Sequence, residues 1–216
     1  MNTYHSIQDD MLQLLKSNEL CDTSVKTTDG ETISFHSLIV NSRTKIPLSK
    51  LKDILFTKTK EEVEEILTFL YSLRTKNYER LEQFCKEIEY PELISRNKSN
   101  LYEKDFESLF KEETNKDFSI ICGETEFKVH KIILFARSEL FRGMFLSVQD
   151  DSGKVHDYRQ SSPQAIQKLI EFFYLDQIHE QIPKEIISEL EEMIDFYQLH
   201  PQTKLIYELR KKGNEK

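Results

Sequence analysis

The residues that could do acid–base or metal chemistry are dispersed singly along the chain. Six histidines are present, at positions 5, 36, 130, 156, 179 and 200. His156 and Asp157 are adjacent, but neighbouring residues of a strand point to opposite faces of a sheet and would not converge on a metal. Paired carboxylates such as Glu61 and Glu62 lie where exposed helix faces are expected. We therefore expect no catalytic site and no metal site.

Motifs that bind cofactors are also absent from the sequence. It has no Walker loop, Rossmann fingerprint, G-x-S-x-G or H-E-x-x-H, and only five glycines are present to build phosphate-binding loops. The three cysteines, Cys21, Cys85 and Cys122, are far apart and form no C-x-x-C pair. This pattern indicates free thiols in a reducing compartment. We therefore expect a non-enzymatic protein without a cofactor, located in the cytoplasm or the nucleus.

Charge and hydropathy narrow the class of partner. The net charge is −8, and Lys and Arg are scattered among acidic residues without forming a basic stripe, so nucleic acid is a poor candidate. No apolar run approaches the ~20 residues that span a bilayer, and residues 1–6 lack the basic and apolar regions of a secretory signal. The expected partners are proteins.

The chain repeats itself, starting with an amphipathic helix. Apolar residues spaced at i, i+4, i+7 and i+8 form the apolar face of an amphipathic helix. The same spacing recurs 95 residues later (102 − 7). The two faces are Ile7, Met11, Leu14 and Leu15, and Tyr102, Phe106, Leu109 and Phe110.

A β-hairpin follows each helix. Asp22 opens one strand-like stretch, and Asp117 opens another at the same offset of 95 residues (117 − 22). In the first hairpin, Asp29-Gly30 predicts a two-residue turn, since Gly supplies the positive φ that such a turn needs. Gly123 plays this part in the second hairpin. The returning strands run into His36 and His130, and then into apolar segments that end at Arg43 and Arg137.

Two pairs of helices complete the repeat. Thr59 and Glu62 predict a capping box, and Ser162-Pro163 predicts an N-cap with Pro at the first helical position. The helices that follow match one another, residues 63–71 with 166–174, and a last pair matches around residues 81–88 and 190–197. A short strand, Val155 to Tyr158, is expected only in the second half.

We therefore predict an α+β fold of two tandem domains, each a small sheet with a β-hairpin clasped by helices. The polar run at residues 95–100 has no apolar periodicity and marks the boundary. The predicted domains are residues 1–96 and residues 97–216.

The second half resembles the BTB/POZ domain over about residues 98 to 208. The resemblance rests on the segments Asp117–Ile120, Phe127–Leu134, Arg137–Phe145 and Ser162–Tyr174, whose order and spacing agree with the family. The first half keeps Asp22, His36, Arg43 and Phe69-Leu-Tyr71 but lacks the Ser-x-x-Phe-x-x-Met-Phe segment. It is similar to a degenerate copy.

The resemblance implies a protein–protein interaction module. Many family members are adaptors that link a client to a cullin ubiquitin ligase through the Phe-x-x-Met-Phe helix and the loop after it. Others are oligomerisation or scaffold proteins without ligase contact, and the sequence leaves both open. The residues that the resemblance suggests for a cullin contact are Phe141, Met144, Phe145, Val148, Asp150 and Tyr174.

Self-association is the other activity that the resemblance implies. Family members commonly dimerise through the first helix, so both apolar faces described above are candidate interfaces, and the face of Tyr102, Phe106, Leu109 and Phe110 is expected to be exposed. Family members also place the Asp before the first strand near the basic residue after the His, here Asp117 and Lys131. The equivalent of Lys131 in the first half is Ser37, so the pair is expected to be lost there. Because the chain has two such faces, they are expected to pair within one chain, with a homodimer as the alternative.

Overall fold

The computed structural model describes residues 6–95, 98–147, 153–157, 159, 161–178, 182–199 and 209. The chain divides into two compact units. The N-terminal unit is Met11–Phe106, and the C-terminal unit combines Met1–Asp10 with Glu107–Lys216. The chain therefore changes unit inside its first helix and again inside the helix that follows residue 97. The predicted boundary at residue 96 lies before Phe106, where the N-terminal unit ends. The domain limits remain a prediction.

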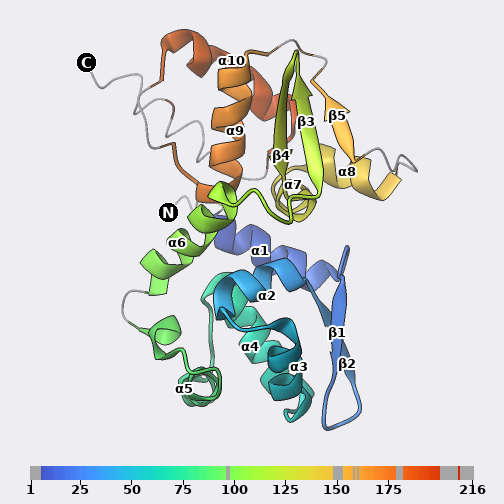
Figure 1. The fold of residues 1–216 in the computed structure, drawn as a ribbon, viewed down its shortest axis with the longest axis vertical. Helices are drawn as coiled ribbons and strands as arrows, with labels where there is room; N and C mark the ends of the chain where they lie inside the picture. Colours follow the sequence, from blue (N-terminus) through green and yellow to red (C-terminus); the bar gives the residue numbers. More distant parts are fainter. Residues whose placement is uncertain are drawn as a thin grey trace. The chain divides into compact units, whose positions relative to one another are not determined.

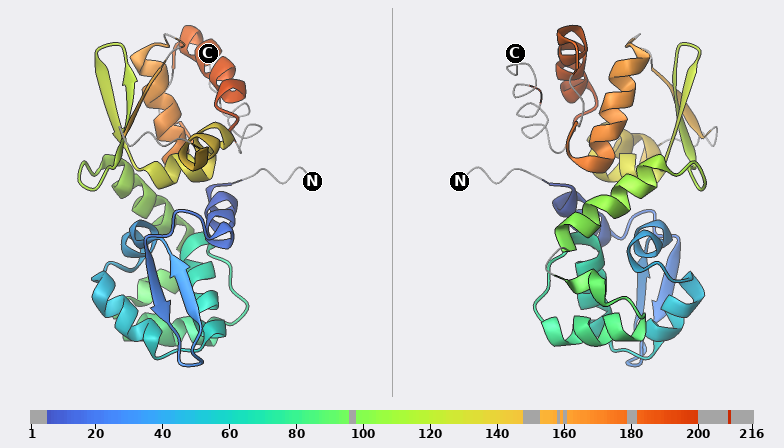
Figure 2. Two further views of the ribbon diagram at one scale, coloured as in Figure 1. Left: turned by 90° about the vertical axis from the view of Figure 1, so that its right-hand side faces the viewer. Right: turned by 60° about the vertical axis from the view of Figure 1, so that its left-hand side comes forward.

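The N-terminal unit is a two-stranded hairpin with helices packed on it. Its elements are α1 (Ile7–Ser17, which begins in the other unit), β1 (Thr23–Lys26), β2 (Thr32–Phe35), α2 (Ser37–Thr44), α3 (Leu48–Phe56), α4 (Lys60–Ser72), α5 (Tyr78–Glu87) and a short 3₁₀ helix, η1 (Pro91–Ile94). In the left view of Figure 2 the two strands lie in front of the helices of this unit. The core between them contains Phe35, Ile39, Phe69 and Phe84, all fully buried.

The turn of the first hairpin is longer than the sequence predicted. Lys26 and Thr32 are the last paired strand residues, and the Thr27 N–H donates to the Glu31 carbonyl at 2.8 Å, which closes a three-residue loop. Gly30 has φ of +86°, as expected. The prediction of a two-residue turn is wrong. Thr27 pairs with Glu31 and its hydroxyl donates to Asp29, so the loop between the paired residues has three residues instead of two.

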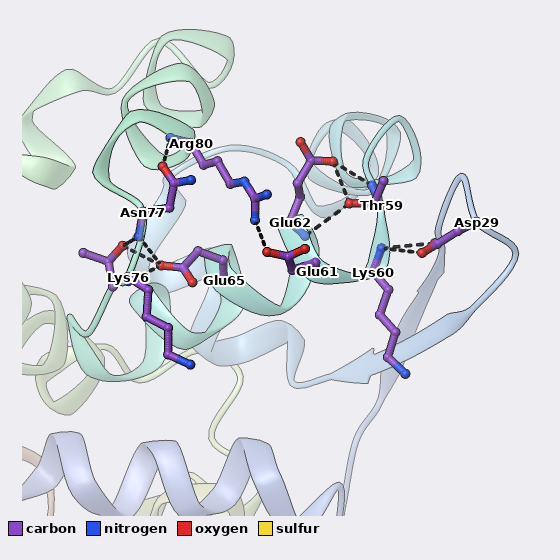
Figure 3. A network of polar contacts seen from close by, with 10 residues as sticks. Asp29, Thr59, Lys60, Glu61, Glu62, Glu65, Lys76, Asn77 and Arg80 are labelled. Carbon is purple, nitrogen blue, oxygen red and sulfur yellow. Dashed lines mark hydrogen bonds and ion pairs between the residues drawn. The ribbon is translucent and has the colours of Figure 1, made fainter.

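The starts of α4 and α5 follow the capping rules (Figure 3). Thr59 and Glu62 form the predicted capping box at α4. The carboxylate of Asp29 accepts from the Lys60 N–H at 3.1 Å, which ties the hairpin turn to the same helix start. Asn77 caps α5 through the Arg80 N–H. These contacts satisfy amides that have no partner inside the helix.

The C-terminal unit has a three-stranded sheet. Its further elements are α6 (Lys98–Lys111, which begins in the other unit), β3 (Phe118–Cys122), β4 (Thr125–Val129), α7 (Lys131–Arg137), α8 (Glu139–Ser147), β5 (Lys154–His156), α9 (Pro163–Leu175) and α10 (Lys184–Phe196). The strand order is β4-β3-β5, and β5 runs parallel to β3. Figure 1 shows α9 beside β4 and α8 near the end of the sheet.

Sequence signals located most of this unit. Cys122 pairs with Thr125 across a two-residue turn whose first residue, Gly123, has φ of +58°. Ser162 caps α9 through the Ala165 N–H, with Pro163 in the first turn as predicted. The short strand expected from Val155 to Tyr158 is found at Lys154–His156, and Tyr158 lies outside the described residues. The mixture of helices with two small sheets confirms the α+β class.

Candidate protein-interaction site

An apolar groove lies between α8, β5 and the end of α10. Its volume is about 530 Å³. Apolar side chains from all three elements line it, and its polar lining residues are Glu139, His156, Asp157 and Gln198. The apolar lining residues are Leu140, Phe141, Met144, Val155, Phe196 and Tyr197.

Backbone and ring contacts fix the walls of the groove. The Glu139 N–H donates to the Gln198 carbonyl at 3.1 Å, and the Ser138 hydroxyl donates to the Tyr197 carbonyl. These bonds hold the start of α8 against the end of α10. The Phe141 ring stacks on the Tyr197 ring with centroids 5.3 Å apart. The groove is therefore built on packed elements, which favours a stable docking surface.

Five of the six residues suggested for a cullin contact fall into three groups. Met144 and Phe145 are half-buried, so part of each is accessible. Phe141 is 1% exposed and belongs to the floor of the groove rather than to its surface. Val148 and Asp150 lie outside the described residues.

The placement of Tyr174 at this surface is wrong. Its side chain is 1% exposed, and its hydroxyl is bonded to His130 in the interior. Burial raises the pKa of Tyr174 well above its usual value. The residue ends a helix on the inner side, where the sequence pattern alone does not show which neighbour covers the ring.

Two exposed apolar residues on α8 and α10 were missed by sequence reasoning. Leu146 is 53% exposed and follows Phe145 on α8, and Phe196 is 43% exposed at the end of α10. The signal for Phe196 was available, because it lies off the face formed by Leu190, Met193 and Tyr197. Large apolar side chains that stay exposed beside a groove are typical of protein-interaction sites.

The apolar faces of α1 and α6 are buried, so the expectation that the α6 face is exposed is wrong. Ile7, Met11, Leu14, Tyr102, Phe106 and Leu109 are at most 5% exposed, and Leu15 and Phe110 are half-buried. Within the N-terminal unit, the Tyr102 ring stacks on Phe106 at 4.7 Å. Within the C-terminal unit, Phe110 contacts Tyr174 with centroids 5.5 Å apart. These faces are used inside the chain.

Each unit also buries an arginine beside an aspartate from one of these helices. Arg137 is fully buried, and its Nη1 lies 2.6 Å from Asp10 Oδ2; it also pairs with Asp176. Arg43 is fully buried and pairs with Asp105. Burial alone would lower the pKa of Arg137, but the two aspartates more than offset this and raise it.

The sequence singled out Arg43 and Arg137 but not their partners. Asp10 and Asp105 are 95 residues apart (105 − 10), the offset of the repeat, and that was the available signal. Each helix thus carries its aspartate at the same place on its face.

The contact between Asp117 and the Lys131 side chain is replaced by another one. Asp117 accepts from the Lys131 backbone N–H at 2.7 Å, while Lys131 Nζ lies 4.8 Å from the centre of the Phe145 ring. In the first half, Asp22 accepts from the Ser37 N–H at 2.7 Å in the same way. The contact is therefore kept in both halves, because a backbone amide at a helix start is present whatever its side chain is.

A further carboxylate fixes the loop between α4 and α5 (Figure 3). Glu65 accepts from the Thr75 hydroxyl and from the N–H groups of Lys76 and Asn77. Burial raises the pKa of Glu65, but these bonds outweigh it and the pKa is lowered. The oxygen is already used by three donors, so this network positions a loop.

No three His, Cys, Asp or Glu side chains in the described part of the chain form a group that could hold a metal ion. None of the helices in the same residues is long and apolar enough to cross a bilayer.

Comparison with known proteins identifies the fold family. The family model of the BTB/POZ domain matches residues 106–213, which is half of the chain. A search of curated proteins returned no match. Domains of this family mediate protein–protein interaction and are generally non-enzymatic. The buried helix face, the hairpin, and the helices α7 to α10 all lie within or beside the matched region, and the chain belongs to the BTB/POZ domain family.

Proposed function

We propose that this protein is a BTB adaptor that links a client protein to a cullin ubiquitin ligase. The proposed contact surface is the groove between α8, β5 and α10. Its helix α8 carries the Phe-x-x-Met-Phe segment through which cullin-binding relatives act. The adaptor is thus an interaction module whose groove takes an apolar partner surface.

The exposed apolar residues of α8 and α10 carry this proposal. Leu146 and Phe196 project large apolar side chains into solvent, and Met144 contributes an accessible part of the groove lining. A central apolar cluster with a polar rim is the usual anatomy of an interface. Glu139 and Asp157 supply acidic groups in the groove lining.

Calorimetry with a purified cullin N-terminal domain tests the proposal. We expect wild-type protein to bind at tens of micromolar or tighter, and Leu146→Asp to weaken binding at least tenfold. Phe56→Asp is the matched control, since Phe56 is 58% exposed on α3 of the other unit. Circular dichroism should be unchanged in both variants. Wild-type protein that shows no binding would end the adaptor proposal and favour an oligomerisation or scaffold role.

A second part of the proposal is that the two halves are tandem copies that pair within one chain. Both halves have the order helix, hairpin, helices. They also share contacts: His36 with Tyr71 matches His130 with Tyr174. Asp10 belongs to the compact unit that contains Arg137, so the first copy supplies a helix segment to that unit.

Light scattering of the intact protein tests this pairing. We expect a mass near 25.7 kDa at micromolar concentration, since tethering raises the effective concentration of one copy for the other to the millimolar range. A stable particle of about twice that mass would favour the homodimer instead.

A further inference from the structure

The C-terminal unit holds the start of α1 by two separate contacts. The Ile7 N–H donates to Asp176 Oδ2 at 2.8 Å, and Asp10 pairs with Arg137. Ile7 is the first residue of α1, so its N–H has no partner inside the helix. Ser6 precedes it and exchanges hydrogen bonds with Asp9 as a helix cap. We call Arg137 and Asp176 the Arg137 site. This site therefore recognises a helix start together with a carboxylate three residues later.

The N-terminal unit holds α6 by different contacts. Arg43 and Lys45 both pair with Asp105, and Lys45 Nζ lies 2.6 Å from Asp105 Oδ1. The Tyr102 hydroxyl donates to the Tyr71 carbonyl at 2.7 Å. The Arg43 guanidinium lies over the Tyr102 ring, 4.7 Å from its centre. We call Arg43, Lys45 and the Tyr71 carbonyl the Arg43 site. This site therefore recognises an aromatic ring with a hydroxyl, together with a carboxylate three residues later.

The Arg137 site and the Arg43 site differ at the C-cap residue of the helix beside each of them. Asp176 is the C-cap residue of α9, with φ of +59°. Leu73 is the C-cap residue of α4, with φ of +61°. The backbone is the same at the two positions, but only Asp176 can accept from a helix start. The N-terminal unit has Lys45 as a second cation instead.

We propose that these differences make the Arg137 site specific for α1 and the Arg43 site specific for α6, so that the two helices are not interchangeable. This inference rests on the proposed pairing of the two copies. It adds that the pairing is selective, and that two second copies from different chains pair poorly. The reasons lie in the helices themselves.

Helix α6 lacks the group that Asp176 binds. Tyr102 stands where α1 has Ile7, but it is the fifth residue of α6, so its N–H is already inside the helix. If α6 occupied the Arg137 site, the carboxylates of Asp176 and Asp105 would both face Arg137. No N–H group from a helix start would then donate to Asp176 and offset part of this buried negative charge. An unshared buried charge is costly.

Helix α1 lacks the groups that the Arg43 site binds. Ile7 has neither the ring that lies under Arg43 nor the hydroxyl that reaches the Tyr71 carbonyl. With α1 in this site, a buried carbonyl would lose its donor and a buried guanidinium would lose its cation–π partner. The kind of partner that fits the Arg137 site is thus a helix that begins at an apolar residue and carries an aspartate three residues on.

Peptide rescue of the full chain tests this selectivity. In Ile7→Ala/Asp10→Ala the start of α1 loses the buried Ile7 side chain and the Asp10 carboxylate that pairs with Arg137, and keeps only the backbone N–H of residue 7 as a donor to Asp176. Peptides of residues 6–17 and 98–111, with blocked ends, are added to this variant. We expect the 6–17 peptide to bind at least tenfold tighter by fluorescence anisotropy and to raise the melting temperature more. The mirror variant, Tyr102→Ala/Asp105→Ala, should prefer the 98–111 peptide.

A third variant and a refolding assay complete the experiment. Asp176→Leu, added to Ile7→Ala/Asp10→Ala, should remove the advantage of the 6–17 peptide. If a variant does not fold alone, it is refolded with each peptide, and only the matching peptide should restore the folded circular dichroism spectrum. Equal action of both peptides, or action of neither, would overturn the selectivity. A wild-type dimer in light scattering would overturn the pairing within one chain and leave the peptide preference to be judged by itself.

Discussion

The hydroxyl oxygen of Tyr174 accepts a hydrogen bond of 2.9 Å from the backbone N–H of His130 and lies 2.8 Å from Nδ1 of the same residue. Tyr71 makes the same two contacts with His36, at 2.8 and 2.9 Å. A hydroxyl that accepts from the amide can donate to Nδ1 of a neutral imidazole. Each contact joins a helix end to the residue where the returning strand of a hairpin becomes a helix.

Removing this hydroxyl should destabilise the protein. In Tyr174→Phe the buried His130 N–H loses its acceptor, and we expect a loss of about 1–3 kcal/mol in the free energy of unfolding. Tyr71→Phe should have a similar effect. Urea denaturation followed by circular dichroism measures both, with Tyr78→Phe as the comparison, because Tyr78 is 51% exposed and its bond to the Ile94 carbonyl can be replaced by water. Equal stability of all three variants would contradict the structural role of the pair.

Replacing Arg137, the buried arginine of the C-terminal unit, should lower the free energy of unfolding more than removing a tyrosine hydroxyl does. Arg137→Met leaves Asp10 and Asp176 buried without their cation, and we expect a loss of about 3–5 kcal/mol. Arg80→Met removes an ion pair with Glu61 at the surface and should cost at most about 1 kcal/mol. Chemical denaturation compares the two variants. A loss of the same size in both would show that burial does not control the cost.

Glu65 should make stability depend on acid pH. Its pKa is lowered in the folded protein, so its contribution is fully present above the unfolded value of about 4.3 and is lost as the pH falls through the folded value. The gap in unfolding free energy between wild type and Glu65→Gln should therefore shrink between pH 6 and pH 3. Glu64→Gln, which removes a carboxylate from the exposed face of the same helix, is the matched control.

The buried histidines should act in a higher pH window. Burial lowers the pKa of both His36 and His130 in the folded protein. Their contribution is present above the unfolded value of about 6.5 and is lost as the pH falls through the folded values. We expect wild-type stability to fall between pH 7.5 and pH 5.5, and His36→Gln/His130→Gln to show a flatter profile. An unchanged slope in the double variant would contradict this.

Local signals predicted the elements well. The capping box of Thr59 and Glu62 and the cap at Ser162 depend on residues within four positions of each other, so the sequence contains all that is needed. The hairpins and the order of elements were predicted for the same reason. The turn at Asp29-Gly30 was predicted one residue too short, because the pairing of Thr27 with Glu31 decides its length.

Partners distant in sequence could not be predicted. Ile7 and Asp176 are 169 residues apart, and no local pattern shows that one binds the other. The predicted exposure of the α6 face was wrong because a helix period shows that a face is apolar but not what covers it. The role of Asp117 was misjudged for a related reason, since its partner is a backbone amide and not the Lys131 side chain.

The division of α1 between two units has a consequence for synthesis on the ribosome. Asp10 emerges early, but Arg137 follows 127 residues later. At about 5–20 residues per second, this interval is roughly 6–25 s. The N-terminal unit is a single stretch of chain and is complete at Phe106, so we expect it to fold first. We expect the start of α1 to keep Ile7 and Asp10 unburied during this interval, until the C-terminal unit that contains Arg137 has been made.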